Sequence, residues 1–147
     1  EMCDTEFKRA MRTGGPATMM ILDIDHFKKV NDNYGHPAGD KTIKMLAKII
    51  AKAIRETDIA GRYGGEEFTI ILPDTNVKSA QIVAERIRKL AEHLPVEYEE
   101  HTIEFTVSIG LAEFHTSFGE YMAWVEKADQ GLYEAKESGR NRVVVSQ

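Results

Sequence analysis

A continuous apolar run at residues 17–24 constrains the fold of this chain more than any other stretch. It reads Ala-Thr-Met-Met-Ile-Leu-Asp-Ile, which has the length of a strand and no alternation between apolar and polar positions. This pattern is typical of a central strand that is covered on both faces. Asp23 and Asp25 lie at its carboxyl end, where open α/β sheets place their ligands. We therefore expect a layered fold around this strand, with an acidic cluster at its end.

A second acidic pair lies in the tetrapeptide Gly-Gly-Glu-Glu at residues 64–67, between apolar runs at 59–60 and 68–72. Paired glycines between strand-like runs predict a tight hairpin turn, because glycine takes positive φ without a steric penalty. Alone, this motif is ordinarily a solvated acidic turn. Brought next to Asp23, its two carboxylates would complete a cage for Mg²⁺, which prefers oxygen ligands.

The rest of the chain alternates between helical and extended patterns. Apolar residues at helical spacing predict helices at residues 4–12, 26–34, 38–56, 76–94 and 119–138. Two further strands are expected within residues 97–115, with a break at 108–110, and a last strand at 143–145. Leu94 and Met122 are expected to face inward. This order predicts an α+β fold, in which helices flank a central, mostly antiparallel sheet.

Composition narrows the class of protein. Residues 1–147 are enough for one domain with a sizeable core. The net charge of −5 argues against a general binder of nucleic acid polymers, which is usually basic. The one cysteine, Cys3, permits no internal disulfide, which fits a reducing, cytoplasmic compartment. No apolar run approaches the roughly 20 residues of a membrane span, and no signal peptide is visible.

A series of short motifs follows in a fixed order along the chain. They are Asp23-Ile-Asp-His-Phe-Lys-Lys-Val-Asn-Asp, Tyr34-Gly-His, Gly39-Asp40, Arg62-Tyr-Gly-Gly-Glu-Glu-Phe, Ala84-Glu-Arg-Ile-Arg, Thr106-Val-Ser-Ile-Gly, Ala128-Asp, Leu132-Tyr-Glu-Ala-Lys and Gly139-Arg-Asn-Arg. Their ordered sum resembles the GGDEF family, the diguanylate cyclases of bacterial signalling. The resemblance implies a fold similar to the palm of nucleotidyl cyclases and polymerases, with a ferredoxin-like βααββαβ core. It also implies the condensation of two GTP into cyclic di-GMP with release of two pyrophosphates.

The resemblance assigns the acidic residues to a metal centre. Asp23, Glu66 and Glu67 match the catalytic carboxylates of the family. Asp23, Glu66 and the backbone carbonyl of Ile24 match its ligands for Mg²⁺ or Mn²⁺, and Glu67 supports the metal or the activation step. The chemistry agrees, because Mg²⁺ is typically held by one or two carboxylates together with substrate phosphates. Considered alone, Asp23 would be an ordinary cap at a strand end.

The same resemblance assigns the substrate contacts. Asn31 and Asp40 match the readers of guanine, where a carboxylate accepts from base N–H groups and an amide both donates and accepts. Arg62 supports the turn or contacts the ligand. The cations that match phosphate-binding positions are Lys28, Lys136 and Arg140. Taken one at a time, the same residues would be loop, cap and solvated helix-end residues.

A separate pattern, Arg55-Glu-Thr-Asp58, lies shortly before the glycine pair. As a bare pattern it is an exposed charge pair. At this offset it resembles the inhibitory site of the family, where cyclic di-GMP binds and stops the enzyme. Arg86 matches an additional arginine of that site, and arginines suit the phosphates and guanine edges of such a product.

Three functions remain open at this point. The first is an active cyclase that works as a homodimer with one GTP in each domain, because a two-fold arrangement makes both equivalent bonds. The second is an inactive module that senses GTP or receives cyclic di-GMP, and the third is an enzyme that makes another cyclic dinucleotide. The chain lacks an initiator Met and begins after the Asp-x-Leu-Thr-x-Leu-x-Asn-Arg segment of the family. We therefore expect the output part of a longer protein, with a sensory or receiver domain upstream.

Overall fold

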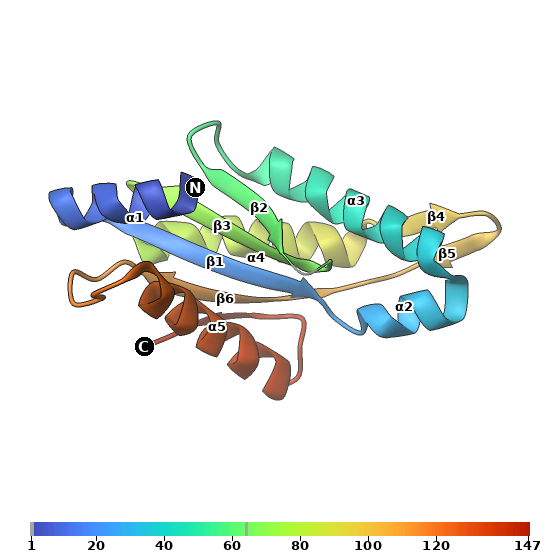
Figure 1. Ribbon diagram of the computed structural model, residues 1–147. Helices are drawn as coiled ribbons and strands as arrows, with labels where there is room; N and C mark the ends of the chain where they lie inside the picture. The colour runs from blue at the N-terminus through green and yellow to red at the C-terminus, as the bar shows by residue number, and fades with distance from the viewer. Residues whose placement is uncertain (1, 64) are drawn as a thin grey trace.

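The computed structural model describes residues 2–63 and 65–147, which build a central sheet with helices on both faces (Figure 1). In this part of the chain the sheet has five strands in the order β2-β3-β1-β6-β7. The strands are β1 Ala17–Ile24, β2 Ile59–Tyr63, β3 Glu67–Pro73, β6 Val107–Glu113 and β7 Val143–Val145. Neighbours run antiparallel except for β6 and β7, so the expected mostly antiparallel sheet is confirmed. Gly64, expected in the turn between β2 and β3, lies outside the described residues.

Strand β1 is central, as its sequence predicts, and every one of its residues is buried. Successive side chains of a strand point to opposite faces, so β1 contributes to two separate cores. Met20 and Leu22 enter the core under one pair of helices, whereas Met19 and Ile21 enter the core on the other face. The absence of alternation in residues 17–24 follows from this double cover.

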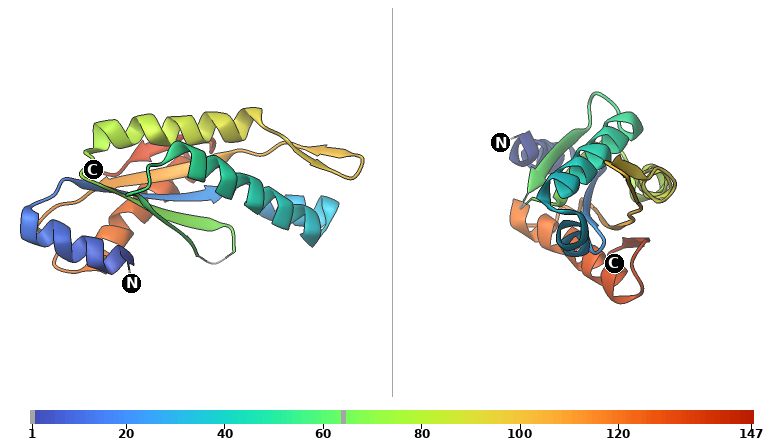
Figure 2. Two further views of the ribbon diagram at one scale, coloured as in Figure 1. Left: turned by 90° about the horizontal axis from the view of Figure 1, so that it is seen from above. Right: turned by 90° about the vertical axis from the view of Figure 1, so that its right-hand side faces the viewer.

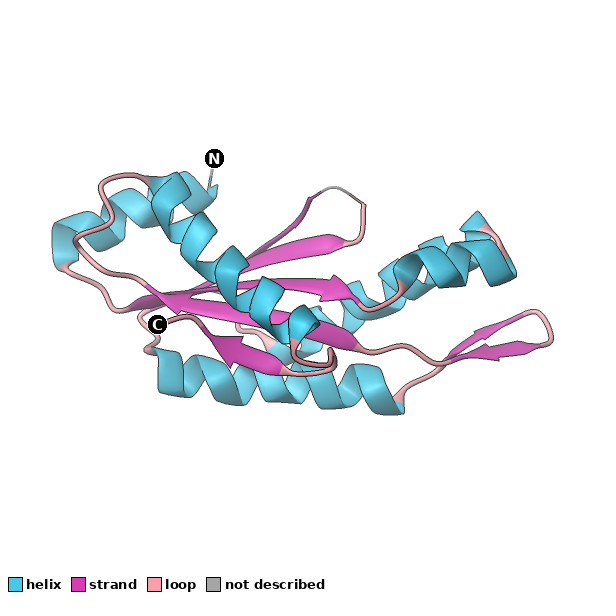
Figure 3. Ribbon diagram, turned by 90° about the horizontal axis from the view of Figure 1, so that it is seen from below, coloured by secondary structure: helices cyan, strands magenta, loops and turns pink. Residues whose placement is uncertain are grey.

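Helices cover both faces of the sheet (Figure 2). On one face lie α3 His36–Ala53 and α4 Val77–His93, and on the other lie α1 Met2–Thr13 and α5 Tyr121–Glu137. Helix α5 crosses the sheet and contacts β1, β6 and β7 (Figure 3). The short α2, Phe27–Tyr34, follows the end of β1 and packs on α3. Within the described residues, no helix combines the length and the apolar character that crossing a membrane requires.

The expected break at residues 108–110 is wrong, because β6 runs through these positions without interruption. The chain leaves the sheet earlier, at 104–106, and β4 Val96–Tyr98 pairs with β5 His101–Ile103 in a separate ribbon that projects beyond the sheet (Figure 1). Gly110 has a packing role instead. A Cβ at this residue would lie 2.1 Å from the backbone nitrogen of Leu132, so the missing side chain lets α5 lie directly on β6.

Leu94 and Met122 were expected to face inward, and both are exposed. Leu94 is 42% exposed because α4 ends at His93 and does not carry the apolar stripe further. Met122 is 51% exposed, and the fully buried position in the first turn of α5 belongs to Trp124, whose indole nitrogen donates to the Ala112 carbonyl at 2.9 Å. The helix expected at 38–56 begins two residues earlier, because Pro37 lies in its first turn, and it also ends three residues earlier, at Ala53.

Candidate functional site

Strand register brings the two acidic motifs together. Asp23 in β1 is paired with Glu67, the first residue of β3. Directly opposed residues of antiparallel strands present their side chains on the same face, with Cβ atoms about 4.5–5.5 Å apart. Glu66, half-buried, lies in the turn one residue before the strand. The register therefore makes Glu67 the direct neighbour of Asp23, and Glu66 the next residue along.

Helix α5 supplies a cation to this pair of carboxylates. Lys136 lies in the last turn of α5, and its Nζ donates to Oδ2 of Asp23 at 2.5 Å. The side chains are 33% and 13% exposed, so the ion pair is partly shielded from solvent. The other oxygen, Oδ1 of Asp23, is buried and has no hydrogen-bond partner among the described residues. A buried carboxylate oxygen without a partner is costly, and this one is free to accept a ligand.

The surroundings of Glu67 carry excess negative charge. Burial raises the pKa of Glu67 above its ordinary value, and the Asp129 carboxylate raises it further. Asp23 and, less strongly, Glu66 act in the same direction, whereas Lys136 lowers the pKa. A second cation at this position would relieve the repulsion.

Asp129 also acts on Glu67, although the sequence motifs gave it no role in the site. It lies in α5 about two turns before Lys136, and residues two turns apart share one helix face. That spacing was a signal visible in the sequence, once Lys136 had been assigned to the site.

The donor set fits a divalent cation that is shared with a substrate. No three His, Cys, Asp or Glu side chains of the described residues form a group that could bind a metal by itself. The protein offers two opposed carboxylates, one unpartnered carboxylate oxygen and the adjacent main chain of Ile24. Mg²⁺ is typically coordinated by such a small set of protein oxygens when phosphates supply its further ligands. The site is therefore suited to a metal–triphosphate complex.

Asp25 does not belong to this cage. Its carboxylate accepts hydrogen bonds from Oγ1 of Thr106 at 2.7 Å, Oγ of Ser108 at 2.7 Å and the backbone nitrogen of Asn141 at 3.0 Å. The residue is only 6% exposed. Its capacity as an acceptor is used by the protein, so the acidic cluster expected at the end of β1 reduces to Asp23.

The two expected guanine readers lie on adjacent helices. Asn31 is in α2, and Asp40 is exposed in the first turns of α3, where it lines a hollow together with Tyr98 of β4. Gly39 lets Asn31 approach α3 closely, because a Cβ at this glycine would lie 2.0 Å from Oδ1 of Asn31. That oxygen is buried and has no partner among the described residues. The amide thus lies close against α3 with one acceptor unused.

The expected phosphate-binding cations differ in their surroundings. Lys136 contacts Asp23 directly, whereas Nζ of Lys28 is on the exposed side of α2, 3.0 Å from Oδ2 of Asp32. Arg140 follows α5 and its backbone nitrogen donates to the carbonyl of Ala135. The last of the expected contacts, Arg62, is exposed in β2 opposite Phe68 of β3.

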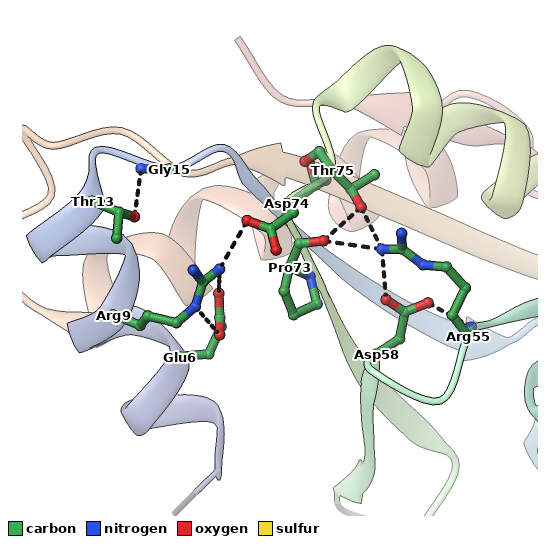
Figure 4. A network of polar contacts seen from close by, with 10 residues as sticks. Glu6, Arg9, Thr13, Gly15, Arg55, Asp58, Pro73, Asp74 and Thr75 are labelled. Atoms are coloured by element: carbon green, nitrogen blue, oxygen red, sulfur yellow. Dashed lines mark hydrogen bonds and ion pairs between the residues drawn. The ribbon is translucent and has the colours of Figure 1, made fainter.

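The Arg55–Asp58 pair is more than an exposed charge pair. The Asp58 side chain is 2% exposed and accepts from both the backbone nitrogen and Nη2 of Arg55, at 2.7 and 3.1 Å. Nη2 also lies 3.0 Å from the carbonyl oxygen of Pro73 and 2.8 Å from Oγ1 of Thr75 (Figure 4). The arginine is therefore fixed at one edge while 59% of its side chain remains accessible.

A hollow of about 300 Å³ adjoins this arginine. Its lining includes Arg55, Asp58 and Thr75, together with Arg86 of α4. The Arg86 side chain is anchored by Nη1, 3.4 Å from the carbonyl oxygen of Ala53. The structure thus brings the three residues of the expected inhibitory site to one concave surface with two guanidinium groups.

Comparison with known proteins places these residues in context. The family model described as diguanylate cyclase, GGDEF domain, matches residues 1–142. Diguanylate cyclase A of Treponema denticola is 45% identical over 129 residues, which are 88% of this chain and 35% of that protein. Diguanylate cyclase DgcP of Pseudomonas aeruginosa is 40% identical over 147 residues, which are 99% of this chain and 22% of that protein. The chain therefore spans well under two thirds of the length of these relatives.

Solved structures agree with the sequence comparison. The GGDEF domain of DgcB from Caulobacter crescentus, in complex with c-di-GMP, superposes with a TM-score of 0.94 at 33% identity. The match covers 99% of this chain and 86% of that one. The active GGEEF domain of a diguanylate cyclase from Vibrio cholerae gives a TM-score of 0.93 at 34% identity, covering 99% and 92% of the two chains.

Proposed function

The chain belongs to the GGDEF family of diguanylate cyclase domains, and we propose that it condenses two GTP into cyclic di-GMP with release of two pyrophosphates. The observation that carries the proposal is the pairing of Asp23 with Glu67 across β1 and β3, beside Lys136. This arrangement combines a free carboxylate oxygen with a cation, which a metal-bound triphosphate requires.

Asp23, Glu66 and the Ile24 carbonyl would hold Mg²⁺ or Mn²⁺, and Glu67, paired with Asp23 across the two strands, would support the metal or the activation step. When bound, the divalent ion would neutralise phosphate charge and activate the attacking oxygen. Lys136 is available to turn from Asp23 to a phosphate once that ion is present. The protein groups therefore position the triphosphate and balance its charge, which is most of what phosphoryl transfer needs.

Base recognition would come from the helices beyond the end of β1. The unused Oδ1 of Asn31 can accept a base N–H, and the Asp40 carboxylate can accept N1–H and N2–H₂ of guanine. Adenine presents no such pair of donors, which supports GTP over ATP as the substrate. Turnover of the two nucleotides, measured side by side, decides between this enzyme and one that makes a hybrid cyclic dinucleotide.

The product itself implies the assembly. Each of its two equivalent bonds joins a 3′-oxygen of one GTP to the α-phosphorus of the other. One site per domain and a two-fold axis between two copies would form both bonds with the same residues. We therefore propose a homodimer in which the acidic ends of β1 face one another. Because the curated relatives are much longer than this chain, a further domain of the same protein would control this encounter on the cytosolic side.

The test is production of cyclic di-GMP from GTP and Mg²⁺, followed by chromatography of the products. Asp23→Asn removes a carboxylate while keeping its shape, and we expect the rate to fall by about 10²–10³-fold, as on removal of one preorganised electrostatic group. Glu100→Gln, in the exposed turn of the β4–β5 ribbon, is the matched control and should leave the rate unchanged. A wild-type dimer that binds GTP but forms no product would refute the enzymatic function.

The hollow between Arg55 and Arg86 supports product inhibition at a second site. Two guanidinium groups facing one concavity suit the phosphates and guanine edges of a cyclic dinucleotide. We expect Arg55→Ala to abolish inhibition by added cyclic di-GMP while initial rates stay within about twofold of wild type. If calorimetry instead shows tight product binding at this hollow in a protein without turnover, the chain is a receptor rather than an enzyme.

A further inference from the structure

The segment after α5 has an unusual backbone. Arg140 and Asn141 both have positive φ, +64° and +48°, directly after Gly139 at +128°. Residues other than glycine rarely adopt positive φ. Consecutive residues in this conformation persist only when surrounding contacts hold them there. The segment that carries Arg140 is therefore fixed by something other than its own conformational preference.

Asn141 supplies these contacts through its backbone nitrogen and both polar atoms of its side chain. Its backbone nitrogen donates to Oδ2 of Asp25 at 3.0 Å. Its side-chain Oδ1 accepts from Nη1 of Arg88 at 3.0 Å, and its Nδ2 donates to Oε2 of Glu92 at 2.7 Å. Two of the three partners are on α4 and the third follows β1, so the segment is held from two sides.

This anchor directly follows the segment that carries the cations that the proposed function needs. Lys136, in the last turn of α5, contacts Asp23, which precedes Asp25 by two residues. Arg140 immediately precedes Asn141, and its backbone nitrogen caps α5 through the carbonyl of Ala135. A shift of Asn141 would therefore move both the end of α5 and the residue next to it.

We propose that Asn141, held by Asp25, Arg88 and Glu92, is a positioning residue that sets Lys136 and Arg140 for the substrate triphosphate. The inference rests on the proposed function for the identity of that substrate. Cations held in advance lose little freedom on binding a polyphosphate, whereas cations on a loose segment lose part of the binding free energy to ordering. Arg88 and Glu92 act through Asn141 and do not touch the nucleotide themselves.

Asn141→Gly is the sharpest test. Glycine adopts positive φ freely and keeps the backbone nitrogen that donates to Asp25, so only the two side-chain bonds to α4 are removed. Thr18→Val is the matched control for stability, because it deletes a buried hydrogen bond to the Thr75 carbonyl near the opposite end of β1. Both proteins are compared with wild type in urea denaturation and in binding experiments.

The binding probes are a non-hydrolysable GTP analogue with Mg²⁺, measured by calorimetry, and guanosine, measured by competition. We expect Asn141→Gly to weaken the analogue by about tenfold and guanosine by less than about twofold, since only the phosphates contact the cations. The control should bind both probes as wild type does, whatever its loss of stability. Arg88→Met should weaken the analogue in the wild-type background but add nothing to Asn141→Gly.

Equal affinity of wild type and Asn141→Gly for the analogue overturns the inference, as does a parallel loss for analogue and guanosine. These outcomes are independent of turnover. A wild-type protein that binds the analogue and makes no cyclic di-GMP contradicts the proposed function alone, because the comparison of affinities still measures the position of the cations.

Discussion

Gly39 offers a direct perturbation of the proposed guanine site. It lies inside α3, where alanine is ordinarily the better helix former. A Cβ at this position would lie 2.0 Å from Oδ1 and 3.1 Å from Cγ of Asn31, and 3.1 Å from Cζ of Phe27. To restore an ordinary contact of 3.4 Å, the Asn31 oxygen must retreat by about 1.4 Å, which exceeds the tolerance of a hydrogen bond. Gly39→Ala therefore tests whether the position of Asn31 matters for the substrate.

Two free-energy contributions to stability oppose each other in this variant. Replacing glycine in a helix contributes about 1 kcal/mol in favour of folding. Overpacking typically costs about 1–3 kcal/mol. The expected net effect on the free energy of unfolding therefore lies between almost no change and a loss of about 2 kcal/mol. Loss of one neutral hydrogen bond to the base costs about 0.5–1.5 kcal/mol, which predicts a KM for GTP up to about tenfold higher.

The assay is steady-state kinetics of cyclic di-GMP formation, with a urea denaturation curve for each protein. Gly119→Ala is the matched control, because nothing lies within 4 Å of a Cβ at that glycine. It should leave KM unchanged. If Gly39→Ala keeps the KM of wild type while folding normally, Asn31 either moves without consequence or does not read the base, and the assignment of the guanine site fails.

Two further predictions concern the acidic pair. In metal-free protein the raised pKa of Glu67 means that the folded state binds the Glu67 proton more tightly than the unfolded chain does. The contribution of this proton to stability is therefore present below the ordinary glutamate pKa, and it is lost as the pH rises through the raised pKa. Glu67→Gln should therefore raise the melting temperature at neutral pH and lose this advantage in acid, and equal effects at both pH values would contradict the sign. Lys136→Met leaves Asp23 without its cation and should cost about 1–3 kcal/mol in urea denaturation, a loss that Mg²⁺ partly restores. Insensitivity of this variant to Mg²⁺ would argue against a metal beside Asp23.

Much of the fold could be predicted because it depends on local pattern. The unbroken apolar run predicted a doubly covered central strand, and helical spacing predicted every long helix to within a few residues. The family is confirmed for the same reason, since its motifs are short, ordered and local. The wrong predictions at Leu94, Met122 and 108–110 concern features that depend on packing against distant elements. These features are the end of α4, the burial of Trp124 instead of Met122, and the close approach of α5 to Gly110.

For the site, the sequence by itself determined that Asp23 ends a buried strand and that two glutamates follow a glycine pair. Only the tertiary structure decided which of them meets Asp23, because pairing register is a contact between distant segments and a shift of one residue exchanges the two faces of a strand. The docking of α5 decided that Lys136, 113 residues away, neutralises Asp23. Docking also decided that Asp25 binds Asn141 rather than a metal, since the donors around a carboxylate come from several elements at once.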